Sequence, residues 1–112
     1  MKKKKRGFVY LLYDQWEERI YKIGVTTGSI EKRIKKLQTG NSGEITMSRY
    51  YETDYPFFIE RALHLKYESK KVLNEWFSLT DEDAKNFIPD CKKIEERIRI
   101  MENNPFFPKN VR

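Results

Sequence analysis

The chain has 112 residues, enough for one domain with a modest core, and 36% of them are charged. Its 14% aromatic content excludes a disordered chain, and no apolar run is long enough to cross a bilayer. The net charge of +6 suits a polyanion, most often nucleic acid, although an anionic membrane surface would attract it equally. The single cysteine, Cys91, excludes a disulfide framework and fits a reducing cytoplasm.

The amino-terminal part of the chain predicts a β-hairpin. Residues 1–6 form a basic tail, and the apolar run after them lacks the cleavage site of a signal peptide. Residues 7–13 predict a buried strand, and residues 19–26 a second strand that returns antiparallel to it. Gly24 inside the second strand indicates either a bulge or a close approach of another group to the backbone there.

Residues 29–38 predict a basic amphipathic helix with Ser29 as its N-cap. Its buried stripe recurs at helical spacing and consists of Ile30, Ile34 and Leu37. Arg33 lies at the rim of that stripe, and the cations further out are Lys32, Lys35 and Lys36. Cations on a helix most often only face water, so this helix alone does not establish a binding surface.

A turn-rich loop at 39–44 leads to a third predicted strand at 45–52. Strict alternation along this strand would place three side chains on one face: Ile45, Met47 and Tyr51. A second helix is predicted at 56–68, capped by Thr53 or Asp54, with Pro56 in its first turn.

On one side of this second helix, Glu60, His64 and Tyr67 recur at i, i+4 and i+7 and so share a face. Such a stripe is more often solvated than catalytic. His64 has two open interpretations: a general acid, base or phosphate ligand, or a structural histidine at an interface.

The last part of the chain predicts a short extended segment at 72–79, with Trp76 and Phe77 buried, and then a third helix. Thr80 and Asp83 resemble a capping box at the start of that helix, and Pro89 is expected to kink or divide it. An apolar seam follows on the helix, formed by Phe87, Cys91, Ile94, Ile98 and Met101.

The order of elements predicts an α+β fold: a small central antiparallel sheet of about three strands flanked by helices. We expect a single domain over 7–104, which includes the last helix, and an irregular tail at 105–112. No membrane association and no organic cofactor are expected. The apolar seam most simply packs within the same domain, so the chain is expected to be a monomer or a weak dimer.

Short motifs over residues 7–79 resemble those of the GIY-YIG nuclease superfamily, in the same order. Residues 7–10 and 21–24 stand for the two halves of the superfamily name. The fuller pattern is similar to a branch of small domains in phage, viral and some fungal proteins, the meiotically-up-regulated type. The motifs of that branch fall here on 9–12, 21–24, Arg33, 37–41, Glu60, His64 and 75–77.

The resemblance implies a metal-dependent DNA endonuclease that hydrolyses phosphodiester bonds with an activated water, in the host cytoplasm if the chain is viral. It implies that Glu60 holds one Mg²⁺ or Mn²⁺ ion, which needs only one or two carboxylates beside water and phosphate. Arg33 would contact the phosphate, and Tyr10 would orient or deprotonate the water. Lys22 and His64 complete the expected catalytic set, and the expected DNA-binding residues are Lys32, Lys35, Lys36 and Asn41.

One position departs from the family pattern. When Gly24 is aligned with the family glycine, Lys22 occupies the place of the second tyrosine, and Tyr21 falls on the opposite strand face. Lysine occurs at this position in some family members, so activity is compatible with it. We expect Tyr21 to pack in the core and Lys22 to face the same side of the sheet as Tyr10.

A catalytically silent or weak DNA-binding module of the same fold is the alternative interpretation. A binding module needs the cations but not Glu60, because an unneutralised carboxylate repels phosphate. An RNA-directed or protein-binding role is a third possibility, and the salt dependence of binding separates protein binding from both nucleic-acid roles.

Overall fold

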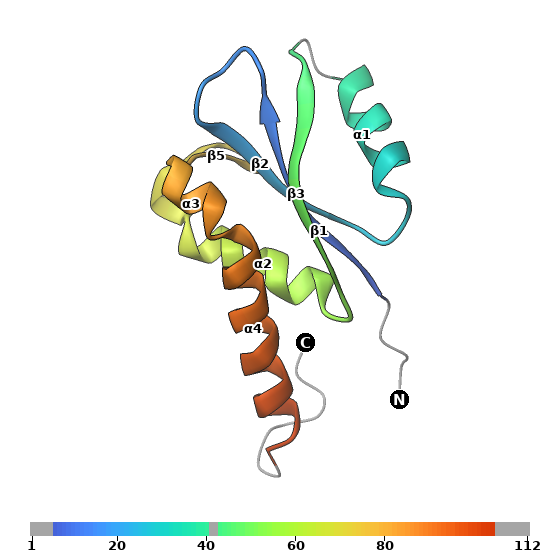
Figure 1. Cartoon of the computed structure of the whole chain (residues 1–112), viewed down its shortest axis with the longest axis vertical. Coiled ribbons are helices and arrows are strands. Elements are labelled where there is room, and N and C mark those ends of the chain that lie inside the picture. Colours follow the sequence, from blue (N-terminus) through green and yellow to red (C-terminus); the bar gives the residue numbers. More distant parts are fainter. Residues whose placement is uncertain (1–5, 41–42, 105–112) are drawn as a thin grey trace.

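A computed structural model of the protein describes residues 6–40 and 43–104. Over these residues, five antiparallel strands form one open sheet in the order β3-β1-β2-β5-β4 (Figure 1). The strands are β1 (Gly7–Asp14), β2 (Ile20–Thr26), β3 (Ile45–Thr53), β4 (Lys71–Leu73) and β5 (Trp76–Ser78). The α+β class and the amino-terminal hairpin are confirmed.

The prediction of about three strands is wrong, because the segment predicted as one extended piece forms a second hairpin. Strands β4 and β5 pair with each other, and β5 pairs with β2. The chain reverses near Asn74, whose φ of 52° lies in the left-handed region that asparagine tolerates better than most residues. Each strand is three residues long, too short for a periodic sequence signal.

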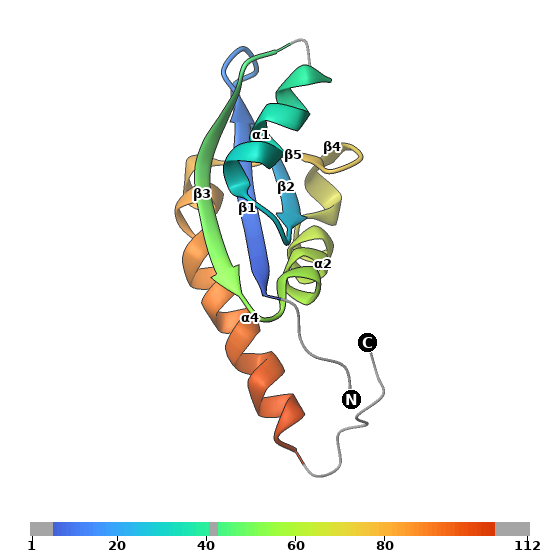
Figure 2. The same ribbon diagram turned by 90° about the vertical axis from the view of Figure 1, so that its right-hand side faces the viewer.

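The helices flank the sheet on both sides. They are α1 (Ile30–Thr39), α2 (Pro56–Lys66), α3 (Asp81–Lys85) and α4 (Phe87–Glu102), with a short 3-10 turn η1 (Glu68–Lys70). Figure 2 shows α1 on one face of the sheet and α4 on the other. None of the helices in the described part of the chain is long and apolar enough to span a membrane.

The alternation of side chains along β1 builds a core on each face of the sheet. Val9 and Leu11 belong to the larger core, which α2, α3 and α4 cover with residues such as Ile59, Leu63 and Cys91. On the other face lie Tyr10 and Leu12, covered by α1 with its expected stripe of Ile30, Ile34 and Leu37. Because β1 is buried on both faces, its sequence is a continuous apolar run.

The predicted alternation along β3 is wrong after its middle. Leu11 pairs with Arg49 and Leu12 with Met47, so one extra residue of β3 is inserted between these pairs as a β-bulge. Ile45 and Met47 share the face that α1 covers, whereas Tyr51, expected on the same face as these two, packs against the larger core on the opposite face. A bulge shifts the period by one residue and reverses every later side chain.

The observed helix caps match those predicted from the sequence in part. Ser29 caps α1, and Thr80 with Asp83 forms the expected capping box at α3. Neither Thr53 nor Asp54 caps α2, whose N-cap position is Tyr55. Thr53 is fully buried, and its hydroxyl accepts the backbone N–H of Tyr55 at 3.0 Å while donating to a carboxylate on α4.

The third predicted helix is indeed divided, but before Pro89. The break between α3 and α4 falls at Asn86, and Pro89 occupies the first turn of α4, where its missing N–H removes no helical hydrogen bond. Four members of the predicted seam pack in the larger core, whereas Met101 is 48% exposed. The expected tail at 105–112 lies outside the described residues.

Glu95 on α4 ties that helix to β3. Its carboxylate accepts hydrogen bonds from the Tyr51 hydroxyl and, at 2.8 Å, from the Thr53 hydroxyl. Burial raises the pKa of Glu95, but the two hydroxyl donors and Arg99 lower it more, so the net pKa lies below 4.5. Burial and the neighbouring carboxylate raise the pKa of Tyr51 to about 12.

We predict that Glu95→Gln lowers the free energy of unfolding at neutral pH by about 1–3 kcal/mol, because hydroxyl bonds to a charged acceptor are lost. The pKa of Glu95 in the folded protein lies below its ordinary value of 4.5. Its contribution to the free energy of unfolding is therefore fully present above pH 4.5 and is lost as the pH falls through the pKa of the folded state. Urea unfolding at several pH values should show that the variant loses less stability on acidification. The exposed neighbour Glu96, changed to Gln, is the control.

Candidate functional site

Tyr10 and Arg33 meet on the α1 face of the sheet, directly above Gly24. Tyr10 pairs with Gly24 across β1 and β2, and a Cβ added to Gly24 would lie 2.4 Å from the Tyr10 hydroxyl oxygen. Only glycine therefore leaves room for the phenol ring. Arg33 Nε donates a hydrogen bond of 3.3 Å to that hydroxyl. Of the two alternatives at Gly24, a bulge or a close approach, the structure has the close approach, and the approaching group is Tyr10.

The guanidinium of Arg33 keeps most of its donors available. Its bond to Tyr10 uses Nε, and within the described residues no other hydrogen bond or ion pair of this side chain is present. The two terminal nitrogens can therefore make a bidentate contact with an oxyanion. The Tyr10 side chain is 1% exposed, so it reaches a ligand mainly through Arg33.

Lys22 lies on the same sheet face as Tyr10, as expected, because it pairs with Leu12 across β1 and β2. Its ammonium forms an ion pair of 2.8 Å with Glu75 and lies 5.6 Å from the centre of the Trp76 ring. Tyr21 faces the other way and packs against the larger core, which confirms the expectation for that residue.

Glu60 and His64 lie on adjacent turns of α2, beside the edge of β2. His64 Nε2 lies 2.9 Å from the backbone oxygen of Ile23 and 3.9 Å from a carboxylate oxygen of Glu60. A carbonyl oxygen only accepts, so Nε2 carries the proton and donates a hydrogen bond to the Ile23 carbonyl. The ring also packs edge-on against Phe77, 4.9 Å between centres. These contacts favour the structural interpretation of His64.

Glu60 lies close enough to Tyr10 and Arg33 for its charge to raise the pKa of each. Burial raises the pKa of Glu60; His64 and Lys22 oppose this, and Glu75 adds to it. Burial also raises the pKa of Tyr10 above 10, against the lowering effect of its bond to Arg33. Tyr10 is therefore a neutral phenol near pH 7, which does not favour it as a base that deprotonates water.

The remaining predicted residues are dispersed. Lys32, Lys35 and Lys36 are exposed on α1, and Asn41 lies outside the described residues. Tyr67 is 5% exposed in the larger core and donates to Asp90 at 3.4 Å, so it does not belong to a solvated stripe with Glu60 and His64. Its backbone N–H bonds to the Leu63 oxygen at 3.0 Å, so the helical spacing extends to Tyr67.

The donor set around Glu60 fits a magnesium ion better than a transition metal. Within 6–40 and 43–104 there is no group of three or more His, Cys, Asp and Glu side chains placed to hold a metal. Magnesium commonly takes one or two carboxylates and completes its shell with water and substrate phosphate. Among these residues the Glu60 carboxylate accepts no hydrogen bond, and its ion-pair contact is His64 at 3.9 Å, so its oxygens remain available.

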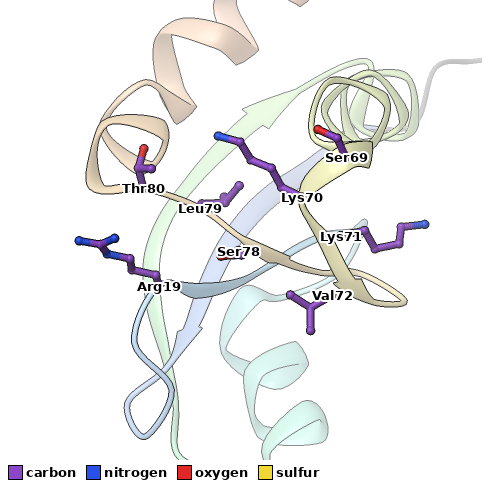
Figure 3. A pocket seen from close by; sticks show the side chains of 8 residues that line it. All are labelled: Arg19, Ser69, Lys70, Lys71, Val72, Ser78, Leu79 and Thr80. Carbon is purple, nitrogen blue, oxygen red and sulfur yellow. The ribbon is translucent and has the colours of Figure 1, made fainter.

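A separate hollow of about 480 Å³ lies beside the β4–β5 hairpin, away from this cluster (Figure 3). Its lining includes Arg19, Lys70 and Lys71. Lys70 is neutralised by Asp83 at 2.7 Å, and Figure 3 shows Lys71 pointing away from Arg19 and Lys70. None of the predicted catalytic residues lines it.

Comparison with known proteins identifies the family of the chain. The model of the T5orf172 domain matches residues 7–92, which include every element from β1 to the start of α4. The chain belongs to the T5orf172 domain family. This domain is found in phage and nuclease-like proteins, and membership indicates a nuclease-like or DNA-binding role. No curated protein and no solved structure matches the chain.

Two residues outside the predicted catalytic set lie beside it. Glu75 pairs with Lys22, and Tyr50 pairs with Tyr10 across β1 and β3. Glu75 belongs to the motif at 75–77, from which we expected it either to flank the site or to be solvated. No sequence signal indicated Tyr50, because strict alternation along β3 assigns it to the wrong face.

We predict that Gly24→Ala lowers the free energy of unfolding by about 1–3 kcal/mol, because its methyl group would overlap the buried Tyr10 ring. Thermal unfolding measures the loss, and tyrosine absorbance monitors the displaced phenol. Gly40→Ala is the matched control, since a Cβ there would meet nothing within 4 Å. Equal stability of the two variants would contradict the close approach.

Proposed function

We propose that this chain is a metal-dependent DNA endonuclease of the GIY-YIG type. The observation that carries the proposal is the contact between Tyr10 and Arg33 above Gly24, with the half-buried Glu60 nearby. A tyrosine, a glycine, an arginine and a glutamate brought together from four elements supply what phosphodiester hydrolysis requires. Membership of a family linked to nuclease-like proteins supports the same conclusion.

Arg33 is the phosphate ligand in this proposal. Its terminal nitrogens stabilise the negative charge that develops on the phosphate oxygens as the bond to the leaving group breaks. Tyr10 is a positioning residue, because its hydroxyl accepts Nε–H and fixes the plane of the guanidinium. The alternative role, in which Tyr10 deprotonates the water, is less favoured because burial raises the pKa of its phenol.

Glu60 is the residue that would hold the metal ion, Mg²⁺ or Mn²⁺. The ion, when bound, supplies a Lewis acid at the leaving oxygen. The raised pKa of Glu60 means that its carboxylate form increases with pH over a range above 4.5. In this proposal Lys22, held by Glu75, orients the attacking water, and His64 holds the backbone of β2 next to Glu60.

One observation favours the silent DNA-binding module as a second candidate. Lys22, at the place of the second family tyrosine, is already paired with Glu75 at 2.8 Å. A lysine engaged in this way contributes less to the activation of water than a free phenol would. The exposed α1 lysines would still attract phosphate in such a module.

The test is the cleavage of supercoiled, linear, branched and single-stranded DNA with Mg²⁺ or Mn²⁺. We predict that Glu60→Gln lowers the cleavage rate about 100-fold or more and leaves DNA binding unchanged or tighter, because a negative charge beside the phosphate is removed. Glu96→Gln, at an exposed carboxylate on α4, is the control. Equal cleavage by wild type and Glu60→Gln would eliminate the metal role, and salt-sensitive binding without any cleavage would support the silent module.

We also predict that Arg33→Ala and Arg33→Lys both lower cleavage about 100-fold, because lysine lacks the planar fork that binds an oxyanion bidentately. Stability should change little, since the Arg33 side chain makes a single hydrogen bond among the described residues. Lys35→Ala, an exposed change on the same helix, should weaken binding slightly and preserve the cleavage rate at saturating DNA. A large fall in melting temperature for both Arg33 variants would make this residue structural instead.

A further inference from the structure

The α1 face of the sheet is only partly covered. Helix α1 packs on the carboxyl half of β1 and the amino half of β3, where Leu12, Ile45 and Met47 lie. The other end of these two strands extends beyond the helix, as Figure 2 shows for the lower part of β1 and β3. The exposed part of this face begins next to Tyr10 and Arg33.

Two aromatic rings occupy the exposed part of this face. Tyr50 is paired with Tyr10 across β1 and β3, so both side chains are on the same face. Phe8 lies two residues before Tyr10 on β1 and therefore also on this face. The rings of Phe8 and Tyr50 meet edge to face at 5.8 Å, and Tyr50 is 54% exposed.

The charges nearest to this aromatic pair are of both signs. Arg6 pairs with Glu52, opposite Phe8 on β3, at 3.1 Å and with Asp54 at 2.8 Å, so one carboxylate charge stays unbalanced, but these side chains are accessible to solvent and screened by salt. The attraction for an anionic partner comes instead from Arg33, bonded to Tyr10 on the same face, and from the net charge of +6. A flat apolar group attached to an anion matches this surface, and an unpaired nucleotide has that chemistry.

We propose that Phe8 and Tyr50 form a stacking platform for an unpaired base next to the phosphate that Arg33 binds. This inference rests on the proposed function and narrows its substrate to DNA that is single-stranded or locally unpaired at the site. The Tyr10–Arg33 contact lies above Gly24 on β2. Neighbouring strands lie about 4.8 Å apart, so this contact is one strand spacing from Phe8 on β1 and two from Tyr50 on β3.

A regular duplex would not use the platform in this way. Each base in a duplex is already stacked on its neighbours, and its faces are reached only after unstacking, which costs free energy. Phosphate contacts by Arg33 and the α1 lysines remain possible with either form of DNA. The platform therefore makes a specific contribution to binding of unpaired DNA, separate from the electrostatic contribution.

The experiment measures binding of the full chain to fluorescein-labelled oligothymidine and to a duplex of the same length by anisotropy, in EDTA so that no DNA is cut. We expect Tyr50→Ala to weaken oligothymidine binding roughly tenfold and duplex binding less than twofold, with an unchanged salt dependence. Tyr50→Phe should retain binding, because it keeps the ring. Phe8→Leu should weaken oligothymidine binding in the same direction. Trp16→Ala is the control, since Trp16 is 75% exposed on the loop at the opposite end of β1.

The inference is overturned if Tyr50→Ala leaves oligothymidine binding unchanged, or if it weakens both DNA forms equally. It is also overturned if Trp16→Ala has the same effect as Tyr50→Ala. Because binding is measured without metal, the result does not depend on catalysis. Tyr50-dependent binding of oligothymidine by a chain that never cuts DNA would support the platform and contradict the proposed nuclease activity.

Discussion

The packing of the Tyr10 ring on Gly24 is the constraint on which the candidate site depends. The ring fills the space where any other residue would place a side chain, so β1 and β2 are fitted to each other at this point. The phenol is thereby buried, and its hydroxyl becomes the acceptor that holds Arg33 of α1. A glycine on β2 thus determines where a cation from a different element lies. This relation explains physically why a tyrosine and a glycine occur together in such a motif.

One face of the sheet mainly stabilises the fold, and the other carries the candidate site. On the larger core, Glu95 and its hydroxyl partners Tyr51 and Thr53 join α4 to β3, and apolar side chains fill the remaining space. On the opposite face, α1 covers the sheet within the described residues, and Arg33 and the exposed ring of Tyr50 lie there. Stability is therefore supplied mainly by one face, which leaves the other free to keep polar groups such as Arg33 without a full set of partners.

Elements with a strong periodic pattern were predictable from the sequence, and those that depend on distant contacts were not. The β1–β2 hairpin, α1 with its Ser29 cap, and the capping box of α3 follow local rules, and all are present. Strands β4 and β5 are too short to carry a period and exist because β5 pairs with β2. The β3 bulge depends on how β3 pairs with β1, so the faces of Tyr50 and Tyr51 could not be derived from β3 alone. The partners of Arg33 and Lys22 likewise required the fold.

The exposed lysines and Arg33 are expected to have different effects: the lysines on the affinity for DNA, and Arg33 on the chemistry at the site. Lys22 is paired with Glu75, and the α1 lysines are exposed, whereas among the described residues Arg33 is the cation that bonds to the Tyr10 phenol. Long-range attraction of DNA arises from the net charge of +6 and is lost readily in salt. Recognition at the site depends instead on a short contact with a half-buried guanidinium and on ring surfaces next to it, which salt screens much less. Changes at Arg33 and Tyr50 should therefore alter which DNA is bound and what happens to it, whereas changes at the α1 lysines should alter mainly how often it arrives.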